Sequence, residues 1–161
     1  MIMSAQDARG PKEHETTTLM RFFFYGTLLD RDVASLVLGR RLPPGAFVPA
    51  ALPGHARRRV KGATYPIVVR DPRGEVRGAM VGGLSARDVK RLAAYEGPRY
   101  RIAQLKVKIG GAVTTVSVFE PVERRFEPTS GAWELVPWQR RYKRAFLARI
   151  KPALSALWST R

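Results

Sequence analysis

The chain has 161 residues and a formal net charge of +16 at pH 7, from 29 lysines and arginines against 13 aspartates and glutamates. The length suggests a single domain, and a hydrophobic fraction of 45% argues against intrinsic disorder despite the charge. The absence of cysteine excludes disulfides, thiolate zinc sites and cysteine nucleophiles, and two histidines are too few for a multi-histidine metal centre. No apolar run approaches the ~20 residues that cross a bilayer, and the polar start lacks the apolar core of a signal peptide. We therefore expect a cytoplasmic protein that does not bind membranes.

The excess of positive charge is typical of chains that attract nucleic acid, anionic membranes or acidic partners. Two basic clusters, at residues 57–59 and 140–144, favour a nucleic-acid-binding module as one interpretation. The usual RNA-binding signatures with interleaved aromatic residues are missing, however. A solvated basic surface is the simpler interpretation, and we expect contact with nucleic acid to be incidental.

The chain divides into a flexible N-terminal tail, residues 1–19, and a single domain, residues 20–161. An apolar run at residues 22–25 predicts a buried strand that ends at Gly26. A short helix follows, with Asp30 or Asp32 as its cap, one apolar face and Gly39 at its end. The apolar face of this helix carries Val33, Leu36 and Val37.

A region rich in proline and glycine comes next and predicts several short strands. The runs expected to form strands cover residues 46–52, 55–62, 64–70 and 75–83. The sequence Asp-Pro-Arg-Gly-Glu at 71–75 is a strong turn signal, so we expect the chain to reverse there.

The second half of the chain predicts a helix, a hairpin and a final helix. Ser85 and Asp88 resemble a capping box, and the helix that they begin points Val89, Leu92 and Ala93 inward and stops before Pro98. Gly110-Gly111 separates two strands at 100–109 and 112–121. A last amphipathic helix begins near Pro137 and carries Trp138, Tyr142, Ala145 and Phe146 on one face. The expected fold is α+β, with about three helices.

Few residues offer catalytic chemistry. Neither a Gly-x-Ser-x-Gly elbow nor a glycine-rich phosphate loop is present. His55 follows a proline-glycine pair in a basic strand and predicts a partly exposed surface histidine. Most carboxylates cap helices, flank turns or, like Glu120, Glu123 and Glu127, fall in a proline-containing loop. Glu96 differs, because the C-terminal end of a helix disfavours its negative charge and so raises its pKa. A carboxyl group of this kind is suited to accepting and returning a proton near neutral pH.

The turn Tyr25-Gly26-Thr27-Leu28 is the second candidate. Successive backbone N–H groups in a tight glycine-containing turn form a concave site for an anion or a carbonyl oxygen. Taken alone, the same four residues are equally the ordinary end of a strand.

Several motifs together make the chain resemble the γ-glutamylcyclotransferase-like superfamily, in its AIG2-like branch. Residues 23–30, Phe-Phe-Tyr-Gly-Thr-Leu-Leu-Asp, are similar to the family's Tyr-Gly-Ser/Thr-Leu strand end. Thr64-Tyr65-Pro66 and Val76-Arg77-Gly78 match a Tyr-Pro strand entry and a Val-x-Gly strand. The segment from Leu92 to Arg101 resembles the family's Leu-Asp-x-Tyr-Glu-Gly stretch. The order and spacing of these motifs cover residues 20–150.

The resemblance implies a small mixed β-barrel flanked by helices. It also implies an enzyme that cyclises a γ-glutamyl amine or peptide to 5-oxoproline and releases the amine, with no cofactor or metal. Glu96 would be the general acid/base, and Tyr25, Gly26, Thr27 and Leu28 would bind the γ-glutamyl substrate. Tyr100 is as good a barrel-core residue as a pocket residue, and we leave it out of the expected site. A non-catalytic γ-glutamyl or anion-binding protein on the same fold is the alternative, since fold does not fix function. The sequence leaves the oligomeric state open.

Overall fold

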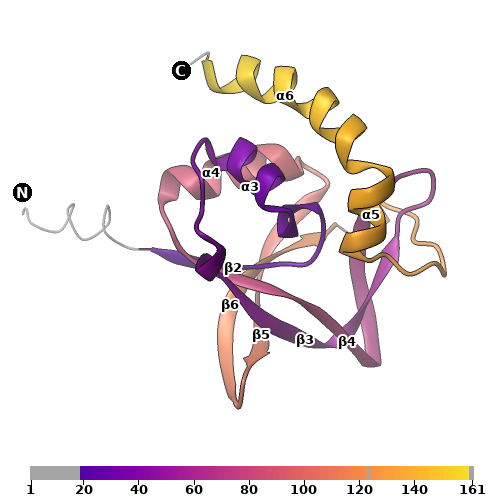
Figure 1. Cartoon of the computed structure of the whole chain (residues 1–161). Helices are drawn as coiled ribbons and strands as arrows, with labels where there is room; N and C mark the ends of the chain where they lie inside the picture. Colours follow the sequence, from indigo (N-terminus) through magenta and orange to yellow (C-terminus); the bar gives the residue numbers. More distant parts are fainter. Residues whose placement is uncertain (1–18, 123, 160–161) are drawn as a thin grey trace, which may run out of the picture.

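The structure is a computed structural model, and it describes residues 19–122 and 124–159. Five strands and four α-helices make up this part of the chain (Figure 1). The strands are β2 (Met20–Phe24), β3 (Phe47–Arg59), β4 (Pro66–Leu84), β5 (Tyr100–Ile109) and β6 (Ala112–Pro121). The α-helices are α3 (Arg31–Leu38), α4 (Ala86–Glu96), α5 (Leu135–Arg141) and α6 (Lys143–Ser159), and short 3-10 turns, η1 (Thr27–Leu29) and η2 (Pro44–Ala46), complete the order.

The strands close into a barrel in the order β2-β4-β3-β5-β6. β2 and β6 pair in parallel, at Phe22 and Ser117, and the other pairs are antiparallel, which confirms the expected mixed barrel. Gly78 of β4 lies where β2 crosses closely, so that a Cβ at this position would collide with the Phe24 carbonyl and the Phe23 ring. The glycine of the predicted Val-x-Gly strand is therefore required by packing.

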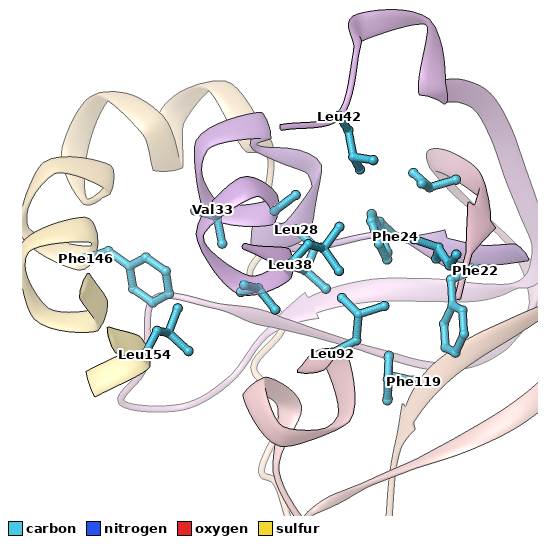
Figure 2. Packing of buried hydrophobic residues seen from close by; sticks show 14 of the residues in the cluster. Phe22, Phe24, Leu28, Val33, Leu38, Leu42, Leu92, Phe119, Phe146 and Leu154 are labelled. Atoms are coloured by element: carbon cyan, nitrogen blue, oxygen red, sulfur yellow. The ribbon is translucent and has the colours of Figure 1, made fainter. Parts of the chain in front are cut away.

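The side chains of β2 point alternately to its two faces, and each face packs into a different hydrophobic core. Phe23 and Tyr25 point into the barrel, where they pack with residues such as Leu52 and Val107. Phe22 and Phe24 point to the other side of the strand, into a layer built with the helices. That layer includes Val33, Leu38, Leu92, Phe119, Phe146 and Leu154 (Figure 2). Figure 1 shows the helices gathered on one side of the barrel, while the β5–β6 hairpin extends away from them. A single strand thus holds both layers together.

Local capping signals place α3 and α4 as predicted. The Asp30 side chain accepts from the N–H groups of Asp32 and Val33, and Gly39 ends α3 in the left-handed region at φ 73°. Ser85 and Asp88 form the reciprocal capping box of α4. The inward face of α4 is partly different from the prediction, because Ala93 is exposed and Arg91 is buried beside Leu92.

The strand region from 46 to 84 is less broken than the sequence suggests. β3 and β4 are two long, paired strands, and the expected chain reversal at 71–75 is wrong. Residues 71–74 instead form an irregularity within β4, because the register jumps from the pair Pro53 and Glu75 to the pair His55 and Arg70. Gly54, at φ 75°, supplies the left-handed backbone on the opposite strand. The turn residues therefore bend a strand without ending it.

The predicted single C-terminal helix is also wrong, since α5 and α6 are separate helices that meet at Tyr142. Trp138 and Phe146 are buried and pack edge-to-face, with ring centroids 5.3 Å apart. Tyr142, which was expected on the same buried face, lies between the two helices and is 39% exposed.

Two other predictions are wrong, and a third concerns residues that the structure does not describe. His55 is buried, not partly exposed, and its Nδ1 lies 3.0 Å from the Pro53 carbonyl oxygen. Glu120 lies within β6 and pairs with Arg101, so it is not a loop residue. Glu123 and residues 1–18 of the expected tail lie outside the described residues. Across residues 19–122 and 124–159, no helix combines the length and the apolar character that a membrane span requires.

Candidate functional site

A cavity of about 440 Å³ lies where the end of β2, the end of α4 and the inner face of α6 meet. Its volume is within the range of small-molecule sites. The five residues predicted for the site all line it. They are Tyr25, Gly26, Thr27, Leu28 and Glu96. The fold thus brings the turn after β2 and the end of α4, about 70 residues apart in sequence, to one cavity.

The turn after β2 is fixed by hydrogen bonds and by close packing. The Leu29 N–H donates to the Gly26 carbonyl, at 2.9 Å, and closes η1. In the described residues, no backbone carbonyl accepts from the N–H groups of Gly26, Thr27 or Leu28. A Cβ on Gly26 would lie 3.1 Å from Pro66 Cγ, which explains why a glycine fits here. The turn therefore presents backbone donors beside the cavity.

One hydrogen bond joins the two predicted segments directly. The Thr27 Oγ1 and Tyr95 hydroxyl oxygens are 2.7 Å apart, and Thr27 itself is buried. Tyr95 directly precedes Glu96 at the end of α4. This contact sets the distance between the backbone donors of the turn and the carboxyl group.

Tyr25 serves the barrel as well as the cavity. Its hydroxyl donates to the Phe119 carbonyl at 2.7 Å, and burial raises its pKa well above the usual value. Arg57 donates to the Tyr25 carbonyl at 3.0 Å and also to the carbonyls of Arg77 and Trp133. One of the basic residues of the 57–59 cluster thus holds the start of the turn in place.

Glu96 is the last residue of α4, as predicted, and its side chain faces the cavity. Burial raises the pKa of Glu96 to about 8. The position at the end of a helix predicts a pKa raised by the helix dipole, whereas the cause in the structure is removal of the carboxyl group from water. In the described part of the chain, the carboxyl group has neither a hydrogen-bonding nor an ionic partner. It can exchange a proton at mildly basic pH.

Sequence reasoning missed part of the cavity lining. Tyr100, which was left out of the expected site, lines the cavity, as do Tyr65, Phe126 and Arg99. Tyr65 and Tyr100 both pack on the Phe126 ring, with centroids 6.3 and 4.9 Å away. Tyr65 belongs to the Tyr-Pro motif noted in the sequence, which was a usable signal. No signal in the sequence indicated Phe126 or Arg99 as part of the cavity.

A second missed part comes from α6. Five residues of this helix line the cavity, namely Phe146, Arg149, Ile150, Ala153 and Leu154. Figure 2 shows Phe146 and Leu154 pointing from α6 toward α3 and Leu28. Amphipathic spacing indicated a buried face for this part of the chain, but it did not indicate a ligand site.

A search for metal-binding groups in the described residues finds no cluster of three or more histidine, cysteine, aspartate or glutamate side chains. Among the described residues that line the cavity, Glu96 is the one with a carboxyl group.

Comparison with known proteins relates this architecture to a family. The sequence model of the family "Gamma-glutamyl cyclotransferase, AIG2-like" matches residues 22–135. The chain belongs to this family. The match includes the turn after β2 and the end of α4, and it ends where α5 begins.

Relatives of the chain have been found in Arabidopsis thaliana. AIG2-like protein A is 28% identical over 139 residues, which is 85% of this chain and 82% of the relative. AIG2-like protein B is 27% identical over 83% of this chain and 77% of its own length. The solution structure of At5g39720.1, from the same organism, has a TM-score of 0.62 at 28% identity and covers 86% of this chain and 92% of its own. A structure of a gamma-glutamyl cyclotransferase shares the fold, with a TM-score of 0.56 at 19% identity over 69% of this chain and 70% of that one.

Proposed function

We propose that this protein is a cyclotransferase that converts a γ-glutamyl amine or peptide to 5-oxoproline and releases the amine. The observation that carries the proposal is the pairing of a buried carboxyl group, Glu96, with the free backbone donors of the Gly26–Leu28 turn across one cavity. The family model supports the same reaction class.

The reaction needs no nucleophile from the protein, because the α-amine of the glutamyl group attacks its own γ-carbonyl carbon. The enzyme must hold the chain folded back so that the two atoms meet, which is a proximity effect. Backbone donors at Gly26–Leu28 would bind the glutamyl end and stabilise the oxyanion that forms on the carbonyl oxygen. Tyr25 would form part of the wall against which the substrate folds.

Glu96 would perform both proton transfers. As a carboxylate it accepts a proton from the attacking nitrogen while the new C–N bond forms. As a carboxylic acid it returns that proton to the leaving nitrogen while the old C–N bond breaks. The attacking α-amine is in its neutral form and loses one proton, and the leaving nitrogen gains one, so the proton count balances and 5-oxoproline and the free amine leave a regenerated carboxylate. A pKa near 8 suits both steps, since neither protonation state is costly to reach at neutral pH.

The test is an assay of free 5-oxoproline across a panel of γ-glutamyl amines, γ-glutamyl amino acids and glutathione. We expect release from at least one class by the wild-type protein, and loss of that release in Glu96→Gln. Glu75→Gln is the matched control, because it removes a carboxylate that pairs with Lys108 and does not line the cavity. Failure of the wild-type protein on every compound would favour the non-catalytic binding protein on the same fold.

A further inference from the structure

The Arg57 guanidinium lies beside the turn after β2 and is bound by backbone carbonyl groups. Its Nη1 donates to the carbonyl oxygens of Tyr25, at 3.0 Å, and Arg77, at 2.9 Å. Its Nε donates to the Trp133 carbonyl oxygen at 2.9 Å, and its guanidinium carbon lies 5.4 Å from the centroid of the Trp133 ring. Three carbonyl groups from three separate segments of the chain therefore hold one planar cation in a fixed place.

The positive charge of Arg57 is not neutralised by direct contact with an acid. Within residues 19–122 and 124–159, no carboxylate forms an ion pair with it. Burial lowers the pKa of Arg57, and the more distant charge of Glu134 opposes that shift. Because arginine remains protonated in proteins, a full charge stands in a partly desolvated place. Its effect on the groups that it contacts is larger there than in open water.

The Tyr25 carbonyl that accepts from Arg57 belongs to the same peptide group as the Gly26 N–H. Gly26 lines the cavity, and in the described residues no backbone carbonyl accepts from its N–H. A hydrogen bond to a carbonyl oxygen withdraws electron density through the conjugated C–N bond and makes the N–H of that peptide group a stronger donor. A charged donor such as a guanidinium increases this effect. Arg57 does not itself line the cavity, so this peptide group is its link to the bound molecule.

We propose that Arg57 is a positioning residue that polarises the Tyr25–Gly26 peptide group and so strengthens the Gly26 N–H as a donor to the oxyanion of the reaction. The inference rests on the proposed function, in which the γ-carbonyl oxygen becomes an oxyanion at the Gly26–Leu28 turn. Because that negative charge develops during the attack, a stronger donor stabilises the transition state more than the bound substrate. Arg57 therefore raises kcat more than it lowers KM.

A merely structural role of Arg57 predicts a different result. The guanidinium also joins β3 to β4 at Arg77 and to the segment before α5 at Trp133, so a structural loss would move the turn as a unit. A displaced turn changes the surroundings of all its amides together, and it weakens substrate binding as well as lowering kcat. Polarisation instead acts on one peptide group.

The test combines the amide spectrum of the protein without substrate and the kinetics of 5-oxoproline release. Arg57→Gln is neutral but keeps a hydrogen-bond donor, and Arg57→Lys keeps the charge but loses the planar fork. Arg58→Gln is the matched control, because it removes the neighbouring charge of β3, whose side-chain hydrogen bond goes to the Arg57 carbonyl and not to the turn. Two-dimensional ¹H–¹⁵N NMR follows the amides of Gly26, Thr27 and Leu28, and urea unfolding measures the stability of each variant.

We expect the Gly26 amide resonance to move in Arg57→Gln, with smaller changes at Thr27 and Leu28, and to lie nearer its wild-type position in Arg57→Lys. For the compound that the wild type converts best, kcat falls about tenfold in Arg57→Gln, which is less than the ~100–1,000-fold cost of removing an oxyanion donor outright. KM changes less than kcat. Arg57→Lys recovers part of kcat, and Arg58→Gln behaves as the wild type.

An unmoved Gly26 amide, or equal movement of the three amides of the turn, would overturn the proposal. So would a change in KM as large as the change in kcat, or a kcat of Arg57→Lys no higher than that of Arg57→Gln. If Arg57→Gln is unfolded, the same criteria for the amides and for KM against kcat apply to Arg57→Lys, with smaller expected changes. A wild-type protein that forms no 5-oxoproline contradicts the proposed reaction, whereas the amide spectra still decide whether Arg57 polarises the peptide group, so the two failures are distinguishable.

Discussion

Two walls of the cavity are built in different ways. The turn wall consists of residues 25–28 with Tyr95 and Glu96, and it is held by directed hydrogen bonds and by the close approach of Gly26 to Pro66. The helix wall consists of the cavity-lining residues of α6, and it is held by apolar packing and by contacts at the first residue of that helix. The family model matches the first wall and ends before the second.

Because the two walls differ in construction, substitutions in them should have different effects on the protein. Changes in the turn wall should alter the reaction itself, because this wall supplies the proposed proton carrier and oxyanion donors. Changes in the helix wall should alter which compounds bind, because this wall supplies packing and a charge.

The ionisation of Glu96 should cost stability at high pH. A carboxyl group whose pKa is about 8 in the folded protein, against 4.5 in the unfolded chain, binds its proton more tightly when folded. The contribution of Glu96 to the free energy of unfolding is therefore fully present below pH 4.5, and it is lost as the pH rises from 4.5 to about 8. Glu96→Gln cannot ionise, so its stability advantage over the wild type should grow across this window to on the order of a few kcal/mol. Urea unfolding at several pH values measures it, and a difference that does not change with pH would refute the buried carboxyl group.

Gly26→Val should disrupt the turn wall with little loss of fold. A Cβ alone already approaches Pro66 to 3.1 Å, so a branched side chain must displace the turn from Pro66. Because small misplacements of catalytic groups are costly, we expect kcat/KM to fall by about 100-fold. Gly111→Val is the control, since space around this glycine is open. Similar activity of the two variants would show that the position of the turn is unimportant.

Thr27→Val should test the hydrogen bond that spaces the turn from α4. The change keeps the shape of the side chain and leaves the Tyr95 hydroxyl without this partner, at a cost of about 1–2 kcal/mol in stability. Adding Tyr95→Phe removes both partners and should recover much of that loss. The measurement is thermal unfolding of the two single variants and the double variant. Strictly additive losses would mean that the two side chains are not coupled.

Lys143→Met should loosen the helix wall by a smaller amount. Lys143, at the start of α6, lies 2.8 Å from Asp30 and 2.7 Å from Asp32, and it tethers α6 to α3. Asp30 keeps its bond to Gln139 and to backbone N–H groups, so we expect a loss of about 1 kcal/mol, with a higher KM and little change in kcat. Arg41→Met, which breaks an exposed pair with Asp32, is the control and should have less effect. A fall in kcat with unchanged KM would contradict the division between the walls.

The sequence predicted well those features that depend on a few neighbouring residues. Asp30 and the Ser85 and Asp88 pair satisfy backbone groups close to them in the chain, and Gly110-Gly111 connects two adjacent strands, and all are found as expected. Glu96 and the turn were found from their local positions, at the end of a helix and at a glycine-containing strand end, and the order of the motifs strengthened both predictions. Both line the cavity, although their chemical roles stay predictions.

The features that failed depend on distant residues. The turn signal at 71–75 was overridden by pairing of β4 with β3, and the helical periodicity through Tyr142 spanned two helices. His55 is polar, yet β3 buries it. Arg99 and Arg149 have no local signal, because their common feature is a cavity that only the closed fold creates. Binding residues from separate elements are the hardest to find in a single sequence.

Glu96 is proposed to carry the proton during cyclisation at this cavity. The most direct measurement is 5-oxoproline formation from the best compound of the panel, with wild type and Glu96→Gln side by side and equal substrate affinity verified by calorimetry. We expect formation by the wild type and a loss of at least about 100-fold in the variant, as for removal of a general acid/base. Undiminished formation by Glu96→Gln would contradict the account.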